Sequence, residues 1–174
     1  EGTSHLVGDP TALTGIYTTT AEGADINAWG VVVHSSTEGY SLRGTINDKV
    51  GSYTTDSTFD VDTGILLTQI TGGLSFLLSD NSVLTGYYQT DADSIDQWGV
   101  ILHSVTDGVS LRGSGNAVGG YTTDSTFTAD GILALQITEG TSHLVGDPTA
   151  LTGIYTTTAE GADINAWGVV VHSS

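Results

Sequence analysis

Short runs of alternating apolar and polar residues fill most of the chain, and glycines separate them. The run from Leu13 to Thr19 places Leu, Gly, Tyr and Thr in alternation with Thr, Ile and Thr, which is the period of two typical of a β-strand. No stretch sustains the 3.6-residue period of an amphipathic helix. The links between runs are short, whereas parallel neighbours need crossovers of a dozen or more residues. The pattern therefore predicts an all-β fold built as an antiparallel β-meander.

About five to six strands are expected in each unit of ~69 residues. They lie near residues 4–7, 13–20, 28–35, 40–46, 57–62 and 65–70, and then near 75–78, 83–90, 97–104, 109–113, 125–129 and 132–137. Turns are expected at 37–39, 63–64 and 106–108, where Gly follows Thr, Asp or Glu. Such units are compatible with a sandwich, a barrel or stacked units, and periodicity does not choose among these.

The chain repeats itself at two levels. Residues 1–36 recur without a change as residues 139–174, at an offset of 138. An older duplication lies within this period, because the block YTTDSTF and the sequence SLRG each occur once in either half. We therefore expect a β unit A (1–71), a β unit B (72–138) and the first half of a further unit A (139–174). Such a chain is expected to be cut from a longer array, or built so that the extra half-unit completes something.

Three stretches resemble the glycine-punctuated meander of avidin-type β-barrels: LTGIYTTT, AWGVVVHSS and STFDVDTGILLTQIT. Tandem β-units of this length are also similar to those of some microbial lectins. The resemblance implies an all-β meander and carries over no ligand-binding residue.

The charge and composition of the chain mainly exclude certain partners and kinds of site. The chain has 20 Asp+Glu but only 3 Lys+Arg, for a net charge of −17. Three cations cannot neutralise a row of phosphates, so nucleic acid and anionic membranes are not expected partners. No apolar run approaches the ~20 residues of a membrane-spanning helix. The chain has no Cys and no Met, which excludes disulfides and thiolate metal sites and suits an extracellular or cell-surface location.

Repeated aromatic and arginine residues are the candidate ligand-binding groups. The tryptophans recur in register and are expected either to stack on sugars or to fill a core. The two arginines are expected to pair with a carboxylate or to bind an anionic ligand. The tyrosine of each YTTDSTF block is a candidate on a binding loop, and its aspartate fits an Asx-type turn. The candidates are Trp29, Trp98, Trp167, Arg43, Arg112, Tyr53 and Tyr121.

Two acidic loops carry spaced oxygen ligands of the kind that Ca²⁺ prefers. Their spacing matches no EF-hand loop, so a solvated turn is the alternative. The candidate Ca²⁺ ligands are Asp25, Asn27, Asp91, Asp93 and Asp96. No Gly-x-Ser-x-Gly, P-loop or HExxH motif occurs, so we expect no catalytic residue, no other cofactor and no enzyme activity.

Two functions follow from these observations. The first is a non-enzymatic extracellular structural or adhesive repeat protein, whose partners are copies of itself in a fibre, surface layer or long adhesin. The alternative is a multivalent carbohydrate-binding module, whose partners are glycans. In the first case, assembly is expected to depend on salt or divalent cations, because acidic surfaces repel one another unless screened.

Overall fold

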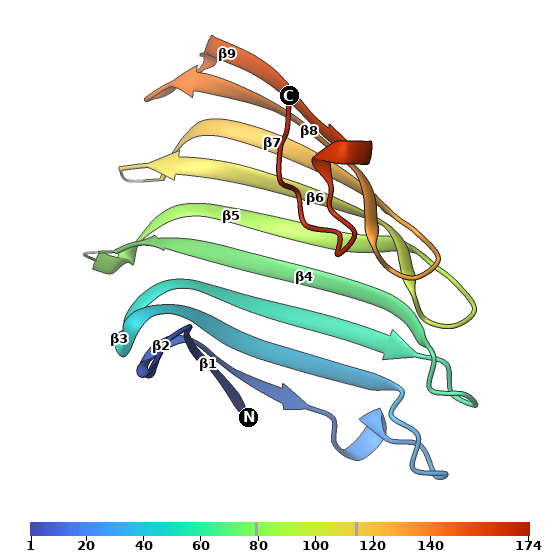
Figure 1. Cartoon of the computed structure of the whole chain (residues 1–174). Coiled ribbons are helices and arrows are strands. Elements are labelled where there is room, and N and C mark those ends of the chain that lie inside the picture. The colour runs from blue at the N-terminus through green and yellow to red at the C-terminus, as the bar shows by residue number, and fades with distance from the viewer. Residues whose placement is uncertain (79, 114) are drawn as a thin grey trace.

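The chain forms one open antiparallel sheet in a computed structural model that describes residues 1–78, 80–113 and 115–174 (Figure 1). Nine strands follow one another in chain order, and each pairs with the next. They are β1 (Gly2–Leu6), β2 (Asp9–Thr20), β3 (His34–Phe59), β4 (Leu66–Leu77), β5 (Asp80–Ile95), β6 (Ile101–Arg112), β7 (Asn116–Phe127), β8 (Leu133–Leu144) and β9 (Asp147–Glu160). Two short 3₁₀ turns, η1 (Gly23–Asp25) and η2 (Gly161–Asp163), complete the described elements. The prediction of an all-β antiparallel meander is confirmed.

Strand β3 bends back on itself, and its two arms act as neighbouring strands. The first arm pairs with β2, where Thr37 lies opposite Thr19, and the second arm pairs with β4. The ring of Tyr53 in the second arm reaches Gly39 in the first. The sheet therefore contains ten antiparallel strands when the arms are counted separately.

Several expectations about local structure are wrong. Residues 28–33 were expected within a strand, but they form a turn followed by an isolated bridge between Ile26 and Val32. Residues 37–39 and 106–108 were expected as turns, but they lie inside β3 and β6. The glycines in these two segments serve cross-strand packing rather than chain reversal.

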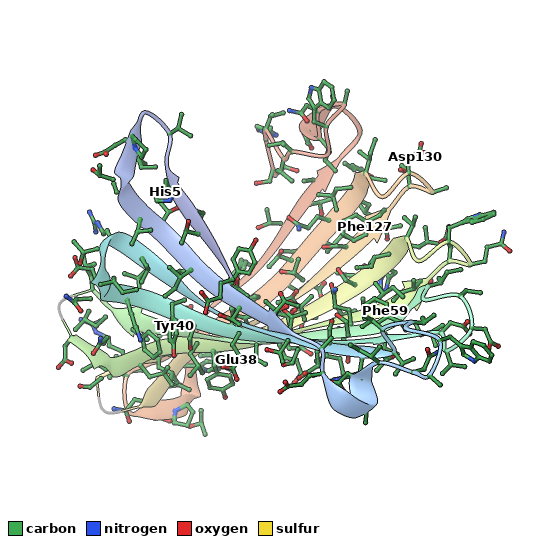
Figure 2. The ribbon with its side chains drawn as sticks, turned by 90° about the horizontal axis from the view of Figure 1, so that it is seen from below. His5, Glu38, Tyr40, Phe59, Phe127 and Asp130 are labelled. Carbon is green, nitrogen blue, oxygen red and sulfur yellow. The ribbon has the colours of Figure 1, made fainter. Side chains whose placement is uncertain are left out.

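The sheet is a single twisted layer. Figure 2 shows the first hairpin and the last strands diverging, with Phe59 and Phe127 toward one end of the strands and His5 and Tyr40 toward the other. Side chains project from both sides of the ribbon, because successive residues of a strand point to opposite faces. Within the described residues there are neither two packed sheets nor a closed barrel.

Burial is low for a chain of this size. The accessible surface is 10524 Å², whereas a monomeric globular protein of 17.9 kDa exposes about 8,000 Å². The buried hydrophobic residues are Leu42, Ala92 and Ala159, and no large side chain is fully buried among those described. Packing within each face of the sheet must therefore supply most of the contacts.

One face of the sheet carries a row in which tyrosine and glycine alternate from strand to strand. Tyr88, for example, lies opposite Gly73 on one side and Gly108 on the other. Each ring covers the glycine of the preceding strand, where a Cβ atom would stand only 2.2–2.4 Å from ring atoms. We call this row the tyrosine–glycine ladder. Its members are Gly2, Tyr17, Gly39, Tyr53, Gly73, Tyr88, Gly108, Tyr121, Gly140 and Tyr155.

Two further rows flank the ladder on the same face. On one side serine and glycine alternate across the sheet, as in Ser75 opposite Gly86. On the other side threonines face one another, and four hydroxyl pairs lie within hydrogen-bonding distance at 2.8–2.9 Å. The rows arise because Thr-x-Gly-x-Ser strands alternate with Gly-x-Tyr-x-Thr strands. In antiparallel register these two motifs are complementary, since threonine meets threonine, glycine meets tyrosine and serine meets glycine.

Candidate functional site: a cross-strand groove and three tryptophan turns

A groove crosses the strands on the face opposite to the tyrosine–glycine ladder. It consists of two separate hollows, one of about 1080 Å³ that runs from β3 to β9 and one of about 540 Å³ over β1 to β3. Each strand contributes three consecutive residues, such as Tyr87, Tyr88 and Gln89. Because successive side chains point to opposite faces, the outer two line the walls and the ladder residue between them supplies backbone. We call this feature the cross-strand groove.

The two walls of the cross-strand groove differ in chemistry. The apolar wall contains Ile16, Tyr40, Leu74, Tyr87, Val109 and Ile154, and the polar wall contains Thr18, Glu38, Gln89, Asp107, Thr122 and Glu139. The Lys49 ammonium lies 3.7 Å from the centre of the Tyr40 ring. The carboxylate of Asp107 accepts a hydrogen bond of 2.6 Å from the Thr122 hydroxyl. Exposed aromatic rings facing carboxylate and amide groups suit a polyhydroxylated ligand.

Three copies of one turn carry the tryptophans. In the first copy, Oδ1 of Asn27 accepts hydrogen bonds of 2.9 Å from the backbone N–H groups of Trp29 and Val31. Asp96 makes the same two bonds in the second copy, and Asn165 makes them in the third. The glycine after each tryptophan has φ between 74° and 82°, a conformation that glycine adopts without strain. The motif Asx-x-Trp-Gly-Val therefore fixes the backbone of each turn.

The tryptophan side chains lie in solvent. Trp29, Trp98 and Trp167 are 88%, 76% and 87% exposed, so the expectation that they fill a core is wrong. The turns follow β2, β5 and β9, which run in the same direction, so all three lie at one end of the sheet. Neighbouring turns are four strands apart, or about 19 Å at the usual strand spacing. Rigid exposed rings in such a row can stack on a ligand or on another chain.

The residues predicted to bind Ca²⁺ have separate structural roles. Asn27 and Asp96 cap the tryptophan turns, Asp25 and Asp93 contact histidines, and Asp91 lies within β5. In the part of the chain that the structure describes, no group of three or more His, Asp or Glu side chains is arranged to hold a metal ion. Ca²⁺ binding therefore stays a prediction.

A histidine near the start of β6 bridges two carboxylates. Nδ1 of His103 lies 2.5 Å from Asp93, and Nε2 lies 2.9 Å from Asp124 on the neighbouring strand. The hydrogen bond to Asp93, followed by that to Asp124, raises the pKa of His103 above its ordinary value, and burial opposes this effect. The bridge therefore ties the end of β5 to β7, across β6, most strongly when the imidazole is protonated.

The same arrangement recurs at the start of β3. His34 lies 3.1 Å from Asp25 and 3.7 Å from Asp56. Asp56 and Asp124 are the aspartates of the two YTTDSTF blocks, which lie in β3 and β7 rather than in turns. The expectation of an Asx-type turn is therefore wrong, because these carboxylates face histidines on the adjacent strands.

The structure separates the remaining candidate residues. The rings of Tyr53 and Tyr121 pack over ladder glycines on the face away from the groove. Arg43 and Arg112 are exposed near the strand ends opposite to the tryptophan turns. Neither arginine forms an ion pair with a carboxylate in the described ranges. The predicted binding residues are thus not brought together at one point.

The aromatic residues that line the groove, Tyr40 and Tyr87, were missed by the sequence analysis. A repeat of one hairpin, shorter than the repeats of about 69 and 138 residues described above, would have identified them. The ladder glycines Gly2, Gly39, Gly73, Gly108 and Gly140 recur at intervals of 37, 34, 35 and 32 residues, which is one hairpin. This period assigns every strand residue to a face and separates groove residues from ladder residues.

No protein-family model, curated protein or solved structure matches the chain. Its function is therefore inferred from the geometry of the sheet. Among the described residues, no helix is long and apolar enough to cross a membrane.

Proposed function

We propose that the chain is a non-enzymatic structural or adhesive repeat protein of the cell surface or extracellular space. It assembles with copies of itself into a fibre, a surface layer or a long adhesin. The observation that carries this proposal is the single-layer sheet, whose accessible surface of 10524 Å² is about a third larger than a globular chain of this mass exposes. A surface of this kind favours association, because apolar burial contributes roughly 25 cal/mol per Å².

The exposed apolar wall of the groove supplies part of this surface. Ile154 is 72% exposed and Tyr87 is 48% exposed, although both lie within paired strands. Leu74, Tyr87 and Val109 lie on three consecutive strands of this wall, and exposed apolar patches of this kind usually mark an interaction site. Contact with another copy would remove them from water.

The hairpin repeat supports assembly in a line. Each hairpin packs its tyrosine on its own glycine strand and meets the glycine strand of the next hairpin. Every added hairpin therefore makes the same contacts as the one before, so stability accumulates along the array as in other solenoid-like repeats. Within residues 1–78, 80–113 and 115–174, no large side chain is fully buried in a core that would limit the number of units.

The proposal is tested by imaging the 174-residue chain in negative stain over a range of concentrations. Extended particles that lengthen with concentration are expected. Discrete particles of monomer size at every concentration would contradict the proposal.

A multivalent carbohydrate-binding module is the second candidate, and the tryptophan turns favour it. Three exposed rings in turns with the same capping hydrogen bonds would offer similar weak sites, and repetition would raise their avidity. Glycan-array binding that is lost when Trp29, Trp98 and Trp167 are changed to alanine would support this function. The matched control is Val7→Ala, which removes a 99% exposed apolar side chain outside these turns. Equal loss in the control would point to nonspecific apolar binding.

A further inference from the structure

The polar wall of the cross-strand groove carries carboxylates with the period of one hairpin. In the groove, the residue directly before a ladder glycine is acidic at Glu1, Glu38, Asp107 and Glu139. Over the larger hollow, Asp107 lies opposite Thr122 of the next strand, and Thr122 lies opposite Glu139. The two carboxylates are therefore two strands apart, or about 9.4–9.8 Å at the usual strand spacing.

The carboxylates of the larger hollow face solvent beside an apolar wall. Asp107 and Glu139 are exposed, and no Lys, Arg or His of the described residues lines this hollow. They lie on β6 and β8, within the part of the groove over β4 to β8, where every strand is paired on both sides. Neither edge of the sheet takes part in this site. An acidic row next to an apolar wall is complementary to a ligand that carries both basic and apolar groups.

The apolar wall accepts a cation in the smaller hollow. The ammonium group of Lys49 lies 3.7 Å from the centre of the Tyr40 ring, where the face of the ring attracts it. Tyr87 belongs to the same wall and is 48% exposed. Among the described residues, no Lys or Arg lies over the Tyr87 ring. The wall thus already receives one basic side chain of this chain and leaves an equivalent ring open.

The floor of the groove restricts the conformation of a bound chain. It consists of the backbone of the ladder residues, whose strands β4 to β8 are each hydrogen-bonded to both neighbours. A peptide that crosses these strands therefore cannot add to the sheet as a further strand. A polyproline II helix has no internal hydrogen bonds and keeps its backbone solvated. It requires no backbone partner from the floor.

The spacing of the carboxylates selects the same conformation. A polyproline II helix has three residues per turn and rises about 9.3 Å per turn, which is close to the separation of Asp107 and Glu139. Residues three apart lie on one side of this helix, whereas in a β-strand they point to opposite sides. An α-helix is too wide at about 10–12 Å, because the two walls stand two residues apart on each strand, or about 6.7 Å.

We infer that the larger hollow of the cross-strand groove binds a polyproline II segment of a partner protein, with Lys or Arg at every third position. Two successive basic residues pair with Asp107 and Glu139. The prolines of the adjoining turn pack on Leu74 and Tyr87. About six residues, or two turns, span the four strand spacings from β4 to β8. Aromatic-lined grooves suit such segments, because the helix is formed before binding and loses little entropy.

A second copy of this chain does not supply such a segment. Its three basic residues are Arg43, Lys49 and Arg112, and no two of them lie three residues apart. Its net charge is −17, so a copy that covers the apolar wall leaves the acidic row without a counter-charge. The inference therefore goes beyond the proposed self-assembly, because it assigns this hollow a different partner.

Fluorescence anisotropy of labelled peptides in about 0.15 M NaCl, where distant charges are screened, tests the ligand class. The probe is a peptide of four Pro-Pro-Lys repeats. The matched control has four Pro-Pro-Pro-Lys repeats, which carry the same charge but distribute it around the helix. The probe is expected to bind about tenfold more tightly than the control, and four Pro-Pro-Glu repeats are expected not to bind. Equal affinity for the two lysine peptides would indicate general attraction to an acidic surface and overturn the inference.

Two double variants locate the site. Asp107→Asn/Glu139→Gln is expected to weaken binding of the Pro-Pro-Lys peptide about tenfold, and asparagine can still accept the hydrogen bond from Thr122. Asp62→Asn/Asp130→Asn makes the same change of charge in exposed turns outside the groove. It should leave the affinity within about twofold. Thermal melting checks that both variants fold. Equal weakening in the two variants would overturn the inference.

The results distinguish this inference from the proposed function. A chain that assembles but does not bind the Pro-Pro-Lys peptide overturns the inference and leaves self-assembly standing. A chain that binds the peptide at this site but never assembles supports the inference and removes the proposed function. If Asp107→Asn/Glu139→Gln abolishes assembly and leaves peptide binding unchanged, the hollow belongs to a second copy and the inference is overturned.

Discussion

The ring of Tyr88 lies on Gly73 of the adjacent strand, so closely that a Cβ atom at Gly73 would stand 2.3 Å from it. This contact is one rung of a ladder that spans the sheet. Burial raises the pKa of Tyr88, and the nearby Tyr121 and Tyr53 hydroxyls add to the rise. The neutral phenol is thus the form that the folded sheet favours.

Gly73→Ala is expected to destabilise the chain by about 1–3 kcal/mol, because the added methyl group displaces the Tyr88 ring. Gly72, the preceding residue of the same strand, provides the control, because a Cβ there meets nothing within 4 Å. Gly72→Ala is expected to be neutral or slightly stabilising. Urea unfolding of both variants measures the difference. Equal effects of the two substitutions would mean that the Tyr88 ring does not set the cost at Gly73.

Asp96→Ala is expected to destabilise the second tryptophan turn by about 1–2 kcal/mol, since two backbone N–H groups lose their acceptor. The chain itself supplies the conservative control, because Asn27 and Asn165 fill the same position in the other turns. Asp96→Asn should therefore keep stability and the emission of Trp98. Tryptophan fluorescence and thermal melting report both effects. An Asp96→Asn variant as unstable as Asp96→Ala would show that charge, rather than capping, matters there.

The His103 bridge is expected to make stability depend on pH. The folded-state pKa of His103 is raised, so its contribution is fully present below the ordinary histidine pKa of about 6.5 and is lost as pH rises through the raised value. His103→Gln should therefore lower the free energy of unfolding more at pH 6 than at pH 8.5, as measured by urea unfolding. Asp124→Asn should behave likewise. Asp130→Asn, at an exposed turn (Figure 2), should show neither effect. A pH-independent cost for His103→Gln would contradict the charged bridge.

Salt is expected to promote assembly, because each chain carries a net charge of −17 and acidic surfaces repel at low ionic strength. Light scattering against NaCl concentration should rise, and CaCl₂ at equal ionic strength separates specific binding from screening. If Ca²⁺ is bound at the acidic loops, EDTA lowers the melting temperature of protein prepared with Ca²⁺. An unchanged melting temperature removes the Ca²⁺ prediction, and scattering indifferent to salt contradicts the role of charge.

The sequence predicts the meander and most of its strands because alternation is a local property. It does not predict that 37–39 and 106–108 are strand interiors, because a glycine preceded by polar residues has the same signature in a turn and beneath a cross-strand ring. Only the partner strand distinguishes the two. The five-fold Gly-x-Tyr-x-Thr motif contains that information, but only when it is read against the five Gly-x-Ser segments.

The candidate site was harder to predict for a similar reason. The tryptophans were singled out by their recurrence, but a period of two was extended through Trp29 into the following strand. Capping by Asn27 bends the chain there and turns the ring into solvent. No local sequence pattern distinguishes the groove residues Tyr40 and Tyr87, because their role depends on how the neighbouring strands are paired.

Sedimentation velocity of the 174-residue chain over a wide concentration range tests the central claim most directly. The native chain is expected to form a growing, open-ended series of species. A native chain that sediments as a single monomer at all concentrations, in low and high salt, would contradict it.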